Sequence, residues 1–160
     1  MRKIFTLFVT AFAMLALTAC GGDKAKTPEQ LIVGTWVSTA PIVVEESGMT
    51  ISITDMAVTY KKDNTTKFNA DMAMSGLMAM ELSFSGTGTW AMEGDQLTET
   101  ITAVDVDMKT EVPGMPDMND MMSEQMIAEG KTTSTIVSLD KKTYVVKDND
   151  SGETMTLKRK

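Results

Sequence analysis

Methionine is the residue type in this chain whose number and spacing could support chemistry. The sequence of 160 residues contains sixteen methionines, with clusters at 72–74, 78–80 and 115–126. Thioether sulfur binds Cu(I) without losing a proton, so the last cluster offers four candidate copper ligands: Met115, Met118, Met121 and Met122. The chain has no His and its single thiol is Cys20, so the usual co-ligands are missing. We therefore favour the alternative, in which these methionines are flexible apolar packing residues.

Carboxylate pairs are the candidates for acid–base catalysis. They are Asp105 with Asp107, Glu45 with Glu46, and Asp148 with Asp150. Asp105 and Asp107 alternate with valines and are expected to face water, where carboxyl groups keep ordinary pKa values and are poor acids at neutral pH. Without histidine, the chain also lacks a side chain whose unperturbed pKa lies near neutrality. We predict that the protein is not an enzyme and has no cofactor.

The charge balance excludes another class of function. Fifteen Lys and Arg stand against 22 Asp and Glu, which gives a net charge of -7 and a sequence pI near 4.6. Binding to a phosphate backbone needs clustered basic side chains that displace counterions. Nucleic acid is therefore not an expected partner.

The first twenty residues have the pattern of a secretion signal. Arg2 and Lys3 supply positive charge, and residues 4–17 contain no charged side chain. This apolar run is shorter than the roughly 20 residues that a membrane-spanning helix needs, so a cleaved signal peptide is predicted over residues 1–19. The segment ends in Leu17-Thr18-Ala19-Cys20, which resembles the lipobox of bacterial lipoproteins.

This resemblance implies a covalent change at Cys20. In proteins with a lipobox the preceding peptide is removed, the cysteine carries a diacylglycerol and the new amino terminus is acylated. Two or more acyl chains hold a protein on a bilayer stably, so a membrane is the first expected partner. Gly21 follows the cysteine, and by the sorting rule of these lipoproteins it implies a place in the cell envelope, on the outer membrane facing the periplasm. Residues 20–29 are small and polar and are expected to form a flexible tether.

Residues 30–160 are predicted to fold as one domain whose clearest element is a long strand. Between residues 82 and 92 the apolar side chains Leu82, Phe84 and Trp90 fall on one face and serines and threonines on the other. Gly86 and Gly88 also fall on the apolar face, where a missing side chain allows sharp coiling or leaves space beside the strand.

A hairpin follows this strand. Residues 93–96 predict a turn, and residues 97–108 form the returning strand. The apolar residues of the returning strand change parity between Ile101 and Val104. A β-bulge near residues 102–104 is expected, because one extra residue brings both sets of side chains to the same face.

The remaining strands are predicted from runs rich in Thr, Val and Ile. They cover residues 31–39, 50–55, 56–61, 66–75, 132–139, 143–147 and 153–158. The linkers between most of these strands are short, and short linkers join antiparallel neighbours because a parallel crossover needs a dozen or more residues. We predict an all-β fold, an antiparallel up-and-down β-barrel of about eight strands.

One segment, residues 112–130, interrupts the strand pattern. Two prolines precede a predicted helix over residues 117–129, with Asp117 capping its first amides and Gly130 closing it with a positive φ. The helix is expected over one end of the barrel or along an edge. Its methionines form one stripe: Met118, Met121, Met122 and Met126.

Three motifs in residues 31–97 resemble the lipocalins and the bacterial lipocalin-like lipoproteins. Ile32-Val33-Gly34-Thr35-Trp36 is similar to the Gly-x-Trp start of that family. Residues 60–65 resemble its early hairpin, and residues 88–97, with Trp90 before a Gly-Asp turn, resemble its central hairpin. The resemblance implies an eight-stranded barrel with an apolar interior and Trp36 at its base. The chain departs from the family in its Met-rich insert and in having no helix after the last strand.

The expected function is non-catalytic binding of an apolar small molecule in the barrel or at its mouth. The candidate ligand-binding residues, which a packed core would use equally, are Trp36, Leu82, Phe84, Trp90, Met118, Met121, Met122 and Met126. The alternative is an interaction module, in which the Met-rich helix or a strand edge docks another protein of the envelope.

Overall fold

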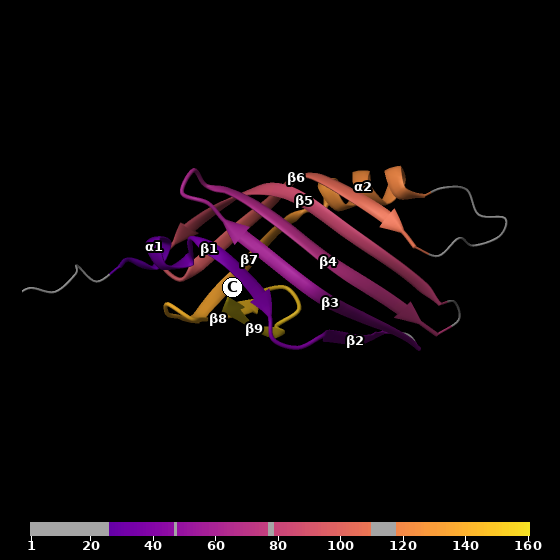
Figure 1. Cartoon of the computed structure of the whole chain (residues 1–160), viewed down its shortest axis with the longest axis horizontal. Coiled ribbons are helices and arrows are strands. Elements are labelled where there is room, and N and C mark those ends of the chain that lie inside the picture. The colour runs from indigo at the N-terminus through magenta and orange to yellow at the C-terminus, as the bar shows by residue number, and fades with distance from the viewer. Residues whose placement is uncertain (1–25, 47, 77–78, 110–117) are drawn as a thin grey trace, which may run out of the picture.

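The computed structural model describes residues 26–46, 48–76, 79–109 and 118–160, and within these the chain forms nine strands and two helices (Figure 1). The strands are β1 (Gly34–Ser38), β2 (Ile42–Glu46), β3 (Met49–Tyr60), β4 (Thr65–Ser75), β5 (Met80–Glu93), β6 (Gln96–Met108), β7 (Lys131–Leu139), β8 (Thr143–Asp148) and β9 (Thr154–Arg159). The helices are α1 (Pro28–Ile32) and α2 (Asn119–Ala128). Neither helix in this part of the chain is long and apolar enough to cross a membrane. The predicted signal peptide, Cys20 and Met115 lie outside the described residues.

Eight antiparallel strands close into a barrel. Strands β3 to β9 pair in chain order, and β1 pairs with both β9 and β3, which joins the two edges of the sheet. This confirms the predicted all-β, up-and-down barrel. Strand β2 is an additional strand that pairs with β3 beyond β1, so that β1 and β2 lie one after the other along the same neighbour.

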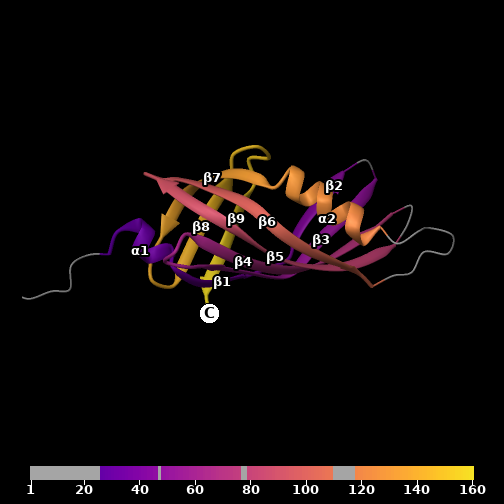
Figure 2. The ribbon, with the colours of Figure 1, turned by 90° about the horizontal axis from the view of Figure 1, so that it is seen from above.

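The barrel is much longer on one side than on the other. Strands β3 to β6 have 11 to 14 residues, whereas β1, β7, β8 and β9 have 5 to 9. Strand β7 pairs with β6 only as far as Thr100, and α2 packs along β6 beyond that point (Figure 2). The predicted helix therefore lies along a strand edge, one of the two expected positions.

Three β-bulges, in β3, β6 and β7, help to set which side chains face the interior, and the one in β7 lies between Ile136 and Ser138. The predicted bulge in β6 is confirmed at Thr102, because Thr87 pairs with Ala103 and Gly88 pairs with Ile101. A second register shift lies in β3 between Thr54 and Ala57. Each bulge adds one residue, so apolar residues before and after it point to the same side of the sheet.

The bulge in β3 also corrects a prediction. Residues 50–55 and 56–61 were expected to form two strands, but the structure has one strand, β3, with Asp55 at φ 47° in the bulge. Aspartate tolerates positive φ better than most residues. The polar residue that resembled a break between strands therefore marks a bulge within one strand.

The first predicted strand is also shorter than expected. Residues 31–39 were predicted to be extended, but Pro28–Ile32 is a helical turn that begins within the predicted tether. Thr27 accepts a hydrogen bond from the backbone N–H of Gln30, whose side chain accepts one from the backbone N–H of Thr27. This capping box, together with Pro28 in the first turn, is a sequence signal that favours a helix start.

The barrel end that carries α1, here called the closed end, is filled by aromatic side chains. Trp36 is fully buried there, and its indole N–H donates to the carbonyl oxygen of Ile32 at 2.6 Å. The ring of Tyr144 lies 5.5 Å from that of Trp36, and the ring of Tyr60 lies 5.8 Å from that of Trp90. The structure thus places Trp36 at the base of the barrel.

Arg159 ties the closed end together. Its guanidinium carbon lies 4.1 Å from the centre of the Trp36 ring, and its N–H groups donate to three backbone carbonyls, those of Leu31, Val33 and Lys141. Gly34 has φ 140°, and a Cβ there would overlap the guanidinium group. The glycine before the tryptophan therefore makes room for the arginine that covers it.

Helix α2 differs from its prediction at both ends. Asp117 lies outside the described residues, and the N-cap is Met118, which makes no side-chain capping bond. Gly130 does not have the predicted positive φ. A Cβ at Gly130 would meet the side chain of Ile101, and the Gly130 carbonyl accepts from the Ile101 amide at 2.8 Å. Gly130 is thus needed for close approach to β6.

We predict that Arg159→Ala lowers the free energy of unfolding by about 2–3 kcal/mol, because three backbone carbonyls, two of them part-buried, lose a charged donor and Trp36 loses its cation. Lys158→Ala is the matched control, since Lys158 is exposed on the same strand, and it should change the value by no more than about 0.5 kcal/mol. Urea denaturation measures both. Equal effects of the two substitutions would show that Arg159 does not hold the closed end.

Candidate ligand-binding site

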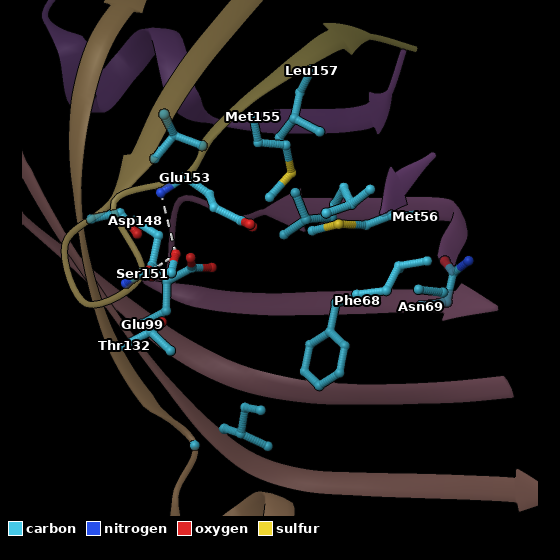
Figure 3. Close-up of a pocket in the computed structure, with 18 of the residues that line it drawn as sticks. Met56, Phe68, Asn69, Glu99, Thr132, Asp148, Ser151, Glu153, Met155 and Leu157 are labelled. Atoms are coloured by element: carbon cyan, nitrogen blue, oxygen red, sulfur yellow. Dashed lines mark hydrogen bonds between the residues drawn. The ribbon is translucent and has the colours of Figure 1, made fainter. Parts of the chain in front are cut away.

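A cavity of about 420 Å³ lies inside the barrel above the packed closed end (Figure 3). Its apolar walls come from β2, β3, β4, β5, β6, β8 and β9, and one side chain of α2, Met126, also lines it. Tyr60 and Tyr144 belong both to the cavity lining and to the packed cluster beneath it. The cavity therefore begins where the aromatic core ends.

A small residue on β4 leaves part of this space open, and a glycine on β5 makes room for one of the wall side chains. Ala70 on β4 lines the cavity, and a Cβ at Gly86 on β5 would overlap the ring of Phe68. Phe68 and Phe84 pack with ring centres 6.4 Å apart. This confirms the prediction that Gly86 faces inward and leaves space beside the strand, which the ring of Phe68 occupies.

Met56 and Ile53 line the cavity from opposite sides of the bulge at Asp55. In a regular strand they would point to opposite faces, because they are three residues apart. The bulge therefore supplies one of the apolar walls, and Figure 3 shows Met56 on the side of the cavity away from the β8–β9 turn, with Met155 between it and Glu153.

Glu99 is the charged side chain of β6 that faces the cavity. It shares the inward parity of Leu97 and Ile101, and the hydroxyl of Tyr60 donates to its carboxylate oxygen Oε1 at 3.0 Å. Burial raises the pKa of Glu99, because the apolar surroundings disfavour the ionised carboxylate. No ion pair among the described residues involves Glu99.

The two tyrosines next to Glu99 share its environment. Burial, and next the negative charge of Glu99, raise the pKa of Tyr60 and of Tyr144. Both phenols are therefore neutral at physiological pH. Together with Glu99 they form the polar end of a cavity that is otherwise mainly apolar, and the ring centres of Tyr60 and Tyr144 are 6.3 Å apart.

The turn between β8 and β9 lies at the mouth of the cavity. Asp148 accepts hydrogen bonds from the backbone N–H and the hydroxyl of Ser151, and these bonds hold its pKa below the ordinary value. These bonds stabilise the tight turn at residues 149–151. Glu153 is exposed, and Figure 3 shows its carboxylate turned toward the cavity. No Lys or Arg is among the described residues that line the cavity.

The structure separates the predicted ligand-binding residues into two groups. Phe84 and Met126 line the cavity. Trp36, Trp90 and Leu82 are buried, as predicted for the interior, but they are not part of the cavity wall. Alternation along a strand predicts the face on which a side chain lies, whereas its height along the barrel depends on the strand register.

The other helix methionines lie away from the cavity. Met118 and Met122 are half-buried on the helix that packs along β6, whereas Met121 is 58% exposed. The predicted single stripe of four methionines is therefore wrong for Met121. The described copper candidates do not share one face of the helix. No group of three or more Cys, Asp or Glu in the described part of the chain could hold a metal ion.

The strand carboxylates face water as expected. Asp105 and Asp107 are exposed on the outer face of β6, and Asp107 forms an ion pair with Lys109 at 3.1 Å. Glu99 was not among the predicted site residues. Glu99 could have been identified from the sequence. It is two residues from both Leu97 and Ile101, and the alternation of this strand predicts that all three side chains face inward.

A scan against models of known protein families finds no match, and a search among curated proteins finds no similar chain. Function is therefore inferred from the cavity itself.

We predict that Glu99→Gln raises the free energy of unfolding by about 1 kcal/mol at pH 7, because the amide still accepts from Tyr60 and carries no buried charge. The folded state raises the pKa of Glu99 above its ordinary value of 4.5. The protonated Glu99 side chain therefore makes its full contribution to stability below pH 4.5. This contribution is lost as pH rises through the pKa that Glu99 has in the folded state. Wild type and variant should therefore have equal stability near pH 4.

Urea denaturation between pH 4 and pH 8 measures this difference. Asp148 titrates in both proteins and cancels in the comparison, and the pKa values of Tyr60 and Tyr144 lie above this range. Glu93→Gln, at an exposed position of β5, is the control and should show no such pH-dependent gain. A variant less stable than wild type at pH 7 would contradict the prediction.

Proposed function

We propose that this protein is a membrane-anchored bacterial lipoprotein of the cell envelope that binds an apolar small molecule in its barrel without catalysis. The observation that carries the proposal is the cavity of about 420 Å³ between the packed closed end and the β8–β9 turn. Small-molecule sites commonly have volumes of roughly 300–1,000 Å³, apolar walls and a few polar groups that fix the orientation of the ligand. Here Glu99, Tyr60 and Tyr144 are such polar groups.

The position of α1 supports the proposed anchor. Helix α1 lies at the closed end, where Arg159 binds its last carbonyls, and the β8–β9 turn lies at the other end of β8. A lipid on Cys20 would attach the protein through the segment that precedes α1. The closed end would then face the membrane, and the cavity mouth would face away from it.

One prediction of this proposal concerns the cavity. Ala70→Phe should fill part of the cavity and weaken the binding of 1-decanol by about tenfold, because each methylene excluded from an apolar site costs roughly 0.8 kcal/mol. Ala73→Phe is the matched control, since Ala73 is exposed on the same strand, and it should bind decanol like wild type. Isothermal titration calorimetry measures both variants, with circular dichroism to check folding.

The binding proposal fails if wild type does not bind decanol and if native mass spectrometry of protein purified from membranes also shows no small-molecule adduct. Binding that is unchanged in Ala70→Phe would place the ligand outside this cavity.

Another prediction of this proposal concerns the anchor. Protein extracted from a bacterial envelope should have the mass of residues 20–160 plus a diacylglycerol and an acyl chain, and Cys20→Ala should be neither cleaved nor lipidated. Cys20→Ser is the closer control, because it keeps the size and polarity of the side chain while removing the nucleophilic thiol. Intact-protein mass spectrometry measures both. An unmodified full-length mass for wild type would refute the anchor.

A further inference from the structure

The carboxylate of Glu99 faces the cavity without a basic partner. Tyr60 supplies one hydrogen bond at 3.0 Å, and no ion pair of the described residues includes Glu99. An ionised carboxylate inside an apolar cavity is costly unless a cation or further donors accompany it. A barrel that only needed to pack its interior would gain stability from an apolar residue at this position.

We propose that the ligand is an amphiphilic amine, whose ammonium group binds Glu99 and whose apolar body occupies the cavity. This inference rests on the proposed function and specifies the class of small molecule that the cavity takes. A charge-assisted hydrogen bond between an ammonium group and a carboxylate is about twice as strong as a neutral one, so the ligand would supply the partner that Glu99 lacks.

The polar groups around Glu99 suit an ammonium group, which has three N–H donors. Glu99 provides a carboxylate, and Tyr60, having donated its own hydrogen to Glu99, can still accept through its hydroxyl oxygen. Thr132 on β7 pairs with Glu99 on β6 and also lines the cavity (Figure 3), and its hydroxyl oxygen is a further acceptor. The rings of Tyr60 and Tyr144 line this end and favour a cation over their faces.

The charge of the mouth favours the same class of ligand. Asp148 and Glu153 line the entrance, the lining has no Lys or Arg among the described residues, and the whole chain has a net charge of -7. A field of this sign attracts cations and repels anions. A fatty acid would place its carboxylate either beside Glu99 or between the acidic groups of the mouth, with no basic side chain to receive it.

The other side of the cavity suits an apolar chain or ring. Met56, Phe68 and Met155 face the space there (Figure 3). Thioether side chains change conformation easily and pack around apolar groups of different shape. The cavity thus has a polar end with one negative charge and an adaptable apolar end, which are complementary to the two parts of an amphiphilic amine.

The test compares three probes that differ only in their head group: decylamine, 1-decanol and decanoate. Binding to the full chain in phosphatidylcholine nanodiscs at pH 7.5 is measured by isothermal titration calorimetry, with empty nanodiscs as the blank. We expect decylamine to bind about tenfold more tightly than decanol, because a hydrogen bond to a charged group contributes about 1.5–3 kcal/mol. Decanoate should bind most weakly.

Two variants test whether Glu99 causes the preference for decylamine over decanol. Glu99→Gln removes the charge and should weaken decylamine binding about tenfold, so that decylamine and decanol then bind to this variant within about twofold of each other. Asp105→Asn is the matched control, because it removes the same charge from the outer face of the same strand, and it should leave the preference for the amine unchanged. Circular dichroism confirms that both variants are folded.

The outcomes separate this inference from the proposed function. Binding of decanol with no preference for decylamine, or tighter binding of decanoate, overturns the amine inference and supports the binding of apolar molecules. A preference for decylamine that persists in Glu99→Gln overturns the role of Glu99. No binding of any of the three probes overturns the proposed function itself.

Discussion

Closure of the sheet by β1 is the constraint on which the rest of the structure depends. Strand β1 has five residues, yet it pairs with β3 on one side and with β9 on the other. Without it, the inward faces of the long strands would be open to water, and Glu99 would be an ordinary solvated carboxylate. Arg159 lies at this junction and binds the carbonyls of Leu31 and Val33, directly before β1. Backbone pairing and one half-buried cation therefore maintain the apolar environment of the cavity.

The architecture could be predicted because residues of an antiparallel barrel alternate between interior and exterior. The parity change between Ile101 and Val104 was sufficient to predict the bulge, and it lies at Thr102. The inward position of Gly86 was predictable in the same way, and the structure shows that the space it leaves is used by Phe68. In each case the alternation of apolar and polar residues along one strand is sufficient to predict which face of the sheet a residue occupies.

The position of the cavity could not be predicted in this way. Trp36, Trp90 and Phe84 all have inward parity, but only Phe84 lines the cavity, because the register between strands determines the height of each residue in the barrel. Asp55 shows a second limit. Two strands were predicted to meet there, whereas the backbone bulges at this residue and one strand continues. Glu99 was detectable by parity, but a charged residue on an inward face conflicts with the rule that charges lie outside.

That conflict is informative about function. The closed end shows that this chain can fill a barrel with aromatic residues: Trp36, Tyr60, Trp90 and Tyr144 pack with ring centres 5.5–6.3 Å apart. Directly above them the packing stops, a cavity opens, and a carboxylate with a raised pKa takes an inward position. Empty space and a buried acid both reduce stability. Their occurrence together, at one level of an otherwise well-packed barrel, is what a binding site requires and what a structural core avoids.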